Sequence, residues 1–229
     1  MELKEYYNDP KGVRSFWLQR EDYSRNIEYL ASQQPEILSL TKPKTFVLGG
    51  FYPSNGTPEA FMDLATTLHP HLKDRHIFLD INQTPLTSIN KDTYPLRLRA
   101  PIERLPFKPG SIDFLFLDFT LNFMNANQRR QFFRSVPKFL THNGLILAAL
   151  VDPKLEELLD DLLGNNRRGH WARHRYFEPE EIITALRSIN KKPPLKVVYN
   201  GGAFGSNLLT LARPNSDFDE LDYTSHCKY

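Results

Sequence analysis

The sequence predicts an α/β fold built on a mostly parallel sheet, and three observations lead to that prediction. Residues 112–117 are apolar except for Asp113, and Phe114 to Leu117 show no alternation, as expected of a strand buried on both faces. Predicted strands and helices alternate along most of the chain. Only residues 200–207 separate the last two predicted strands. A parallel crossover needs about a dozen residues or more, so these two strands should form an antiparallel hairpin.

Seven segments are predicted to be strands, from their apolar runs and the turn residues around them. They are residues 45–48, 76–79, 96–99, 112–117, 145–151, 195–199 and 208–212. The fifth is entered through a predicted turn at Asn143-Gly144. We therefore expect a Rossmann-like three-layer sandwich, with a seven-stranded, mostly parallel sheet and an antiparallel C-terminal strand.

Five segments are predicted to be helices: residues 21–31, 57–68, 127–140, 154–163 and 178–189. Thr57-Pro58-Glu59 has the order expected of an N-cap and the first helical residues, and Pro179 opens the last helix in the same way. Pro137 lies inside the third and should kink or shorten it. We divide the chain into an N-terminal helical cap (1–40), a main domain (41–214) and an acidic tail (215–229) that we expect to be disordered.

Composition excludes several classes of protein. The formal net charge is only +2, so no nucleic-acid or membrane partner is expected from the total charge. Cys227 is the single cysteine, which excludes an internal disulfide framework and fits a reducing compartment. No apolar run approaches the roughly 18 residues of a membrane span, and the first residues are too charged for a signal peptide. We expect a soluble, cytoplasmic protein, with no prediction of its oligomeric state.

Motifs for several chemistries are missing from the sequence. His69 and His71 flank Pro70, but no further ligands are spaced to join them, so no metal site is predicted. There is no Gly-x-Ser-x-Gly elbow, Walker loop or paired-cysteine motif. Asp113, near the start of its strand, is better explained as a structural anchor than as a functional acid.

Acidic and glycine residues follow three of the predicted strands. Gly49-Gly50 ends the first, Asp80 the second and Asp118 the fourth. Ligands of open α/β sheets bind at the carboxyl ends of the strands. Because those ends share one edge of a parallel sheet, we expect these residues to flank a single hollow there.

Four pieces of the sequence follow one another in the order of these elements. They are FLDIN at 78–82, IERLPFKPGSIDFLFLDFTLNFM at 102–124, FFRSVPKFLTHNGLILAAL at 132–150 and HRYFEPEEIITAL at 174–186. With these pieces in this order, the sequence resembles the class I S-adenosylmethionine-dependent methyltransferases of the methyltransferase-11 type, from about Lys44 to Pro214. The resemblance implies S-adenosylmethionine as cofactor, bound by Gly49, Gly50, Phe51, Asp80, Ile81, Ile102, Glu103, Asp118 and Phe119.

The implied roles divide between the two ends of the cofactor. Asp80 would accept hydrogen bonds from both ribose hydroxyls, since its two oxygens can serve two donors. Ile81 would lie against the adenine, with Ile102 and Glu103 beside its edge.

At the other end, Asp118 and Phe119 would line the floor below the methionine part. Gly49 and Gly50, followed in the same loop by Phe51, would let the backbone approach that part closely.

The sequence also departs from the family pattern. Val47 stands where the family usually has an acid, and Pro101 stands where another acid would contact the adenine amino group. Phe51, Tyr52 and Pro53 break the family's glycine pattern after Gly49-Gly50. This degenerate glycine loop keeps open a second hypothesis, a catalytically inactive methyltransferase-like binding or assembly module. A nicotinamide-dependent oxidoreductase is disfavoured by the terminal hairpin and by the lack of Gly-x-Gly-x-x-Gly, unless the last two strands are parallel.

The favoured function is methyl transfer to a small-molecule acceptor. The sulfonium donor is already activated, so the protein mainly supplies alignment, and no acid–base pair is required.

A cluster rich in Arg, His and aromatic residues lies at 165–176. It could hold an anionic substrate, but we favour a solvated loop, and nucleic acid is not expected there. His170 and His174, within it, are the candidate bases if the acceptor must lose a proton.

Overall fold

The computed structural model describes residues 45–49, 76–81, 83–89, 91–92, 96–118, 120–151, 179–189, 193–203 and 206–220. The N-terminal cap and the predicted helices at 21–31, 57–68 and 154–163 lie outside these residues, as do the basic cluster at 165–176 and the end of the chain from residue 221.

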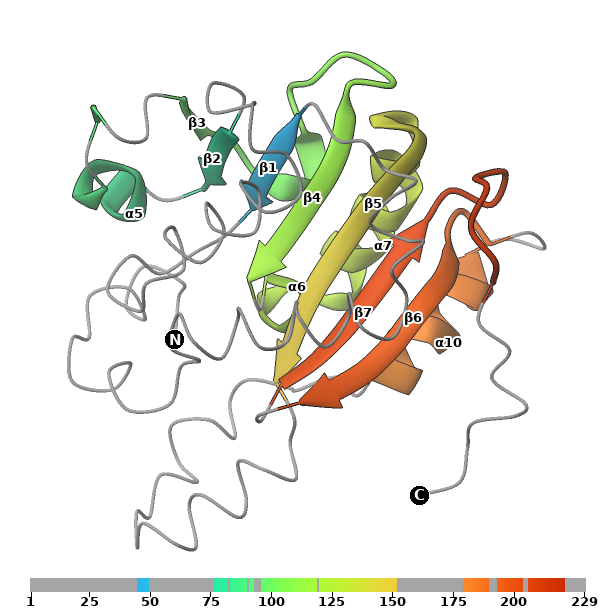
Figure 1. The fold of residues 1–229 in the computed structure, drawn as a ribbon. Helices are drawn as coiled ribbons and strands as arrows, with labels where there is room; N and C mark the ends of the chain where they lie inside the picture. The colour runs from blue at the N-terminus through green and yellow to red at the C-terminus, as the bar shows by residue number, and fades with distance from the viewer. Residues whose placement is uncertain are drawn as a thin grey trace, which may run out of the picture.

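The described strands form one seven-stranded sheet in the order β3-β2-β1-β4-β5-β7-β6 (Figure 1). Its strands are β1 (Phe46–Gly49), β2 (His76–Asp80), β3 (Arg97–Arg99), β4 (Ile112–Asp118), β5 (Leu140–Val151), β6 (Lys196–Ala203) and β7 (Ser206–Ala212). The pairs from β3 to β5 are parallel, and β7 is antiparallel to both β5 and β6. The α/β fold class and the antiparallel terminal hairpin are therefore confirmed.

Strand β5 begins earlier than predicted. Asn143-Gly144 is not a turn before the strand but part of it, where the pairing with β4 shifts from Ile112↔Leu140 to Phe114↔Leu145. A Cβ on Gly144 would lie 2.7 Å from the carbonyl oxygen of Ile112. The glycine therefore allows a close approach of two strands, which a local pattern cannot distinguish from a turn.

The described helical segments are α5 (Gln83–Ser88), η2 (Ile102–Arg104), α6 (Thr120–Phe123), α7 (Ala126–Ser135), η3 (Val136–Lys138) and α10 (Pro179–Ile189). Asn125 caps α7 by accepting from the backbone N–H groups of Asn127 and Gln128, at 3.0 Å each, and the Gln128 side chain accepts in return from the backbone of Asn125. The α-helix ends at Ser135 and continues as the 3₁₀ turn η3. The expected shortening around Pro137 is confirmed.

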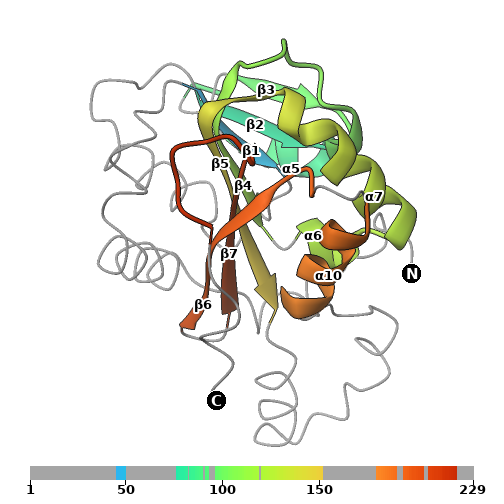
Figure 2. The same cartoon turned by 90° about the vertical axis from the view of Figure 1, so that its right-hand side faces the viewer.

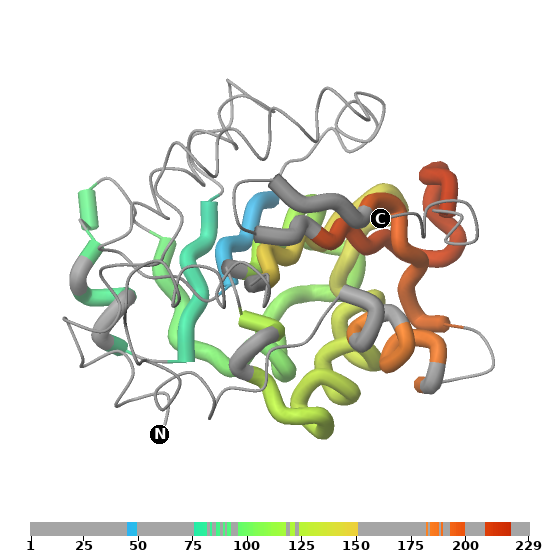
Figure 3. Tube along the Cα trace, turned by 90° about the horizontal axis from the view of Figure 1, so that it is seen from below, coloured from blue at the N-terminus to red at the C-terminus, as the bar shows by residue number. Residues whose placement is uncertain are grey.

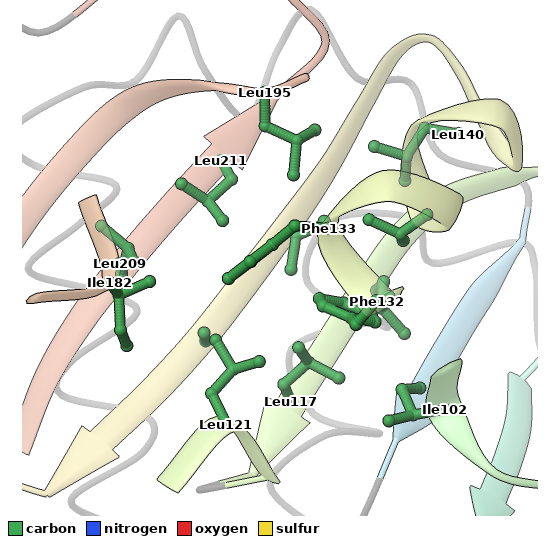
Figure 4. Close-up of a cluster of buried hydrophobic side chains, with 14 of the residues drawn as sticks. Ile102, Leu117, Leu121, Phe132, Phe133, Leu140, Ile182, Leu195, Leu209 and Leu211 are labelled. Atoms are coloured by element: carbon green, nitrogen blue, oxygen red, sulfur yellow. The ribbon is translucent and has the colours of Figure 1, made fainter. Parts of the chain in front are cut away.

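Helices α6, α7 and α10 lie on one face of the sheet (Figures 1 and 2), and the view from below shows α7 beside the row of strands (Figure 3). Phe132 and Phe133 of α7 are fully buried and project onto this face (Figure 4). Alternate residues of each strand point to opposite faces, and the other face carries its own buried aromatics, with the rings of Phe46 and Phe114 centred 5.8 Å apart.

Asp113 anchors the amino end of the sheet. One oxygen accepts from the backbone N–H of Thr45, just before β1, and the other accepts from the hydroxyl of Thr141 in β5, both at 2.9 Å. One carboxylate thus joins three neighbouring strands at the end opposite to Asp80 and Asp118. The prediction that Asp113 has a structural role is confirmed.

The structure describes the segment after β7 as far as Glu220. Lys196 donates to the carbonyl groups of Ser216, at 2.9 Å, and of Phe218, whose side chain is buried. Asp217 accepts from Asn143 at 2.8 Å, and this bond, with a weaker contribution from His142, lowers the pKa of Asp217. The expectation of a disordered tail is therefore wrong for residues 215–220, because hydrogen bonds to β5 and β6 hold them; residues 221–229 lie outside the described part.

None of the described helices has the length and apolar composition that a membrane span requires. The described residues contain no group of three or more His, Cys, Asp or Glu side chains that could hold a metal ion.

Candidate functional site

The register of the parallel strands brings the predicted site residues to one edge. Gly49, the last residue of β1, pairs with Leu79 of β2 on one side and with Leu117 of β4 on the other. The next residues along those two strands are Asp80 and Asp118. The glycine and the two acids therefore end neighbouring strands, as the sequence predicted.

Asp80 combines deep burial with a position at the strand end. It is only 2% exposed, and its carbonyl accepts from the backbone N–H of Ala100 at 3.0 Å. The next residue, Ile81, is 48% exposed, and its carbonyl accepts from Nε of Arg99 at 3.1 Å. The edge thus places a buried carboxylate next to an exposed apolar side chain.

The turn η2 follows β3 and lies against both β1 and α7. Ile102 is buried in the core beside Gly49. Glu103 is half-buried, and its carbonyl accepts from the hydroxyl of Ser135 in α7 at 3.2 Å. These contacts hold η2 in place at the same edge of the sheet as Asp80.

Gly49 is constrained by its own neighbours. A Cβ at this position would lie 2.8 Å from Cδ1 of Ile102 and 3.1 Å from Cδ2 of Leu117. Side chains of β4 and η2 therefore use the space that the missing side chain leaves. The same face of β1 carries Val47, fully buried in the core, where the family pattern would have an acid.

Thr120 is a residue of this edge that the sequence reasoning missed. It opens α6, two residues after Asp118, and its hydroxyl donates to the carbonyl of Gly49 at 2.6 Å. The only signal in the sequence was a hydroxyl side chain shortly after the acid that ends β4.

Several predicted site residues cannot be placed at this edge. Gly50, Phe51, Phe119, His170 and His174 lie outside the described residues. Their roles stay predictions.

Comparison with known proteins gives a match to a family model over part of the chain and matches to solved structures. Residues 61–148 match the sequence model of a family described as a methyltransferase domain. No curated protein sequence matches the chain. The solved structures that match it include a protein from Pyrococcus horikoshii OT3, with a TM-score of 0.58 and 14% identity over 91% of this chain and 98% of that one.

Two further matches are named methyltransferases crystallised with S-adenosylhomocysteine. The N-methyltransferase NodS from Bradyrhizobium japonicum WM9 has a TM-score of 0.56 and 16% identity, over 90% of this chain and 93% of that one. The magnesium protoporphyrin IX methyltransferase from Synechocystis PCC 6803 has a TM-score of 0.53 and 9% identity, over 83% of each chain. The chain therefore has the fold of the class I methyltransferases and carries, over residues 61–148, the sequence pattern of their methyltransferase-domain family.

Proposed function

We propose that this protein binds S-adenosylmethionine at the edge formed by Gly49, Asp80 and Ile81, and transfers its methyl group to a small-molecule acceptor. The observation that carries the proposal is the buried carboxylate of Asp80 beside the exposed Ile81, one residue beyond the register pair of Gly49. Two structures with the same fold were crystallised with the demethylated cofactor, S-adenosylhomocysteine.

The described residues suit this cofactor. The Asp80 carboxylate can accept hydrogen bonds from a ribose diol, for which the atoms that cover its 2% exposed side chain must move aside. Ile81 offers an apolar surface to an adenine ring. Gly49 ends its strand at the same edge, where Ile102 and Leu117 fill the space beside it, and η2 bounds the edge on the side of β3.

When bound, the cofactor supplies a methyl group on a positively charged sulfur, which is already a good leaving group. The residues of the chain then have three tasks: to hold the donor, to align the acceptor behind the methyl group and to exclude water. His170 or His174 would take a proton from the acceptor where one must leave. Replacing both histidines without loss of turnover would remove that role. The single cysteine, Cys227, supports a cytoplasmic location for this activity.

We also consider a second function, because two residues of the chain differ from the family pattern. Val47 is fully buried and apolar, and Pro101 is half-buried, where the family pattern has acids. A chain that lost both contacts could keep the fold as a binding or assembly module without catalysis.

Calorimetry separates the two functions. Wild-type protein is titrated with S-adenosylmethionine and with S-adenosylhomocysteine, at concentrations that detect a dissociation constant of about 100 μM, or about −5.5 kcal/mol. Binding of either supports the methyltransferase, and a crystal soaked with S-adenosylhomocysteine should then show the ribose beside Asp80. No heat with either ligand would favour the module.

A further inference from the structure

A hydroxyl links two segments that leave the sheet at the proposed cofactor edge. Thr120, the first residue of α6, donates to the carbonyl of Gly49, the last residue of β1, at 2.6 Å. This length is within the normal range of an O–H···O hydrogen bond. The bond is partly buried and joins residues 71 positions apart in the sequence.

The bond lies where the ladder of the sheet ends. Strands β1 and β4 are neighbours, and their last register pair is Gly49↔Leu117. After that pair the chain leaves β1, while β4 continues by one residue, Asp118, before α6 begins. The hydrogen bond from the Thr120 hydroxyl to Gly49 therefore fixes the distance between the segment that follows β1 and the segment that follows β4, beyond the last backbone pair of the two strands.

The distance between the segments that follow β1 and β4 matters for the proposed reaction. The residues after β1 and those after β4 are the ones expected to flank the methionine part of the donor, which carries the methyl group. Transfer requires the donor and the acceptor in line, and a displacement of about 1 Å can cost about 100-fold in rate. The hydrogen bond from Thr120 to Gly49 limits that displacement, because it joins the segments that follow β1 and β4.

We infer that Thr120 is a positioning residue for the methyl donor: through Gly49 it holds the two sides of the cofactor site at a set distance. This inference rests on the proposed function. Thr120 acts on the site through the backbone of β1, and its role requires no contact with the cofactor.

The opposite end of the sheet offers a matched control. Thr141 also donates its hydroxyl across strands, to Asp113 at 2.9 Å, and that bond is also partly buried. Asp113 and Thr141 lie at the amino ends of β4 and β5. Thr141→Val therefore removes a similar bond from the same sheet, away from the proposed site.

The experiment measures S-adenosylhomocysteine binding by calorimetry and thermal unfolding for the wild type, Thr120→Val, Thr120→Ser and Thr141→Val. Thr120→Val should bind about tenfold more weakly, equivalent to about 1.4 kcal/mol. Thr120→Ser, which keeps the hydroxyl, should bind within about twofold of the wild type. Thr141→Val should unfold at a lower temperature but bind like the wild type. If Thr120→Val does not fold, Thr120→Ala removes the same hydroxyl and takes its place.

The outcomes separate this inference from the proposed function. Wild-type protein that binds neither S-adenosylmethionine nor S-adenosylhomocysteine overturns the proposed function, and this inference with it. A wild type that binds, together with a Thr120→Val variant of equal affinity, overturns the inference alone. Equal losses of affinity in Thr120→Val and Thr141→Val would also overturn it, because the effect would then be one of general stability.

Discussion

The most direct test of the proposed site is the replacement of Asp80 by asparagine. The amide has nearly the same shape as the carboxylate but carries no charge and keeps only one acceptor oxygen. Asp80 is 2% exposed, so solvent screens its bonds very little. A hydrogen bond to a charged group contributes about 1.5–3 kcal/mol, against about 0.5–1.5 kcal/mol for a neutral pair.

Asp80→Asn should therefore weaken binding in proportion to the ribose bonds that it loses. A loss of about 1 kcal/mol at each of two hydroxyls amounts to about 2 kcal/mol, or about 30-fold in the dissociation constant for S-adenosylhomocysteine. Calorimetry measures the constant, and circular dichroism during heating shows whether the variant is folded.

The control is Asp217→Asn, which makes the same chemical change in an exposed acid bonded to the amino-end part of β5. This variant should bind like the wild type. A folded Asp80→Asn variant whose affinity stays within about twofold of the wild type would refute the reasoning, because the acid would then make no bond to the ligand.

Three further predictions concern stability, and thermal or urea unfolding measures each. Asp113→Ala removes two hydrogen bonds to a carboxylate and should lower the free energy of unfolding by about 3 kcal/mol, the low end for two such bonds because both are only partly buried. Gly49→Ala places a Cβ 2.8 Å from Cδ1 of Ile102 and should cost about 1 kcal/mol, which Ile102→Val should partly restore by removing that carbon. Thr210→Val should raise the free energy of unfolding by about 1 kcal/mol, because the Thr210 hydroxyl is buried and has no hydrogen-bond partner among the residues that the structure describes.

Each of these predictions has a distinct contrary result. Asp113→Ala with unchanged stability would mean that the two bonds contribute nothing net. If Gly49→Ala and Ile102→Val simply add, the two side chains do not compete for the same space. A Thr210→Val variant less stable than the wild type would mean that the hydroxyl is satisfied in solution, for example by an ordered water.

Much of the sheet could be predicted from local pattern. Phe114 to Leu117 indicated a strand buried on both faces, and the short connection at 200–207 indicated the terminal hairpin. Both signals are local: a run of apolar side chains reports burial directly, and a connection too short for a crossover leaves only one geometry.

The candidate site was predicted in part, and for a related reason. Parallel strands end at a common edge, so the strand ends alone placed Gly49 and Asp80 together. The bond from Thr120 to Gly49 depends instead on which strands are neighbours, since β1 and β4 are adjacent although β2 and β3 lie between them in the sequence.

The class of fold, most strand positions and the edge where a ligand should bind thus follow from local features of the sequence, because periodicity, turn residues and loop length act over a few residues. The packed fold was needed to show that Asn143-Gly144 lies within β5, that Asp217 bonds to Asn143, and that Thr120 bonds to Gly49. Each of these contacts joins backbone or side chains brought together by the order of strands in the sheet, and that order is a property of the whole packed chain.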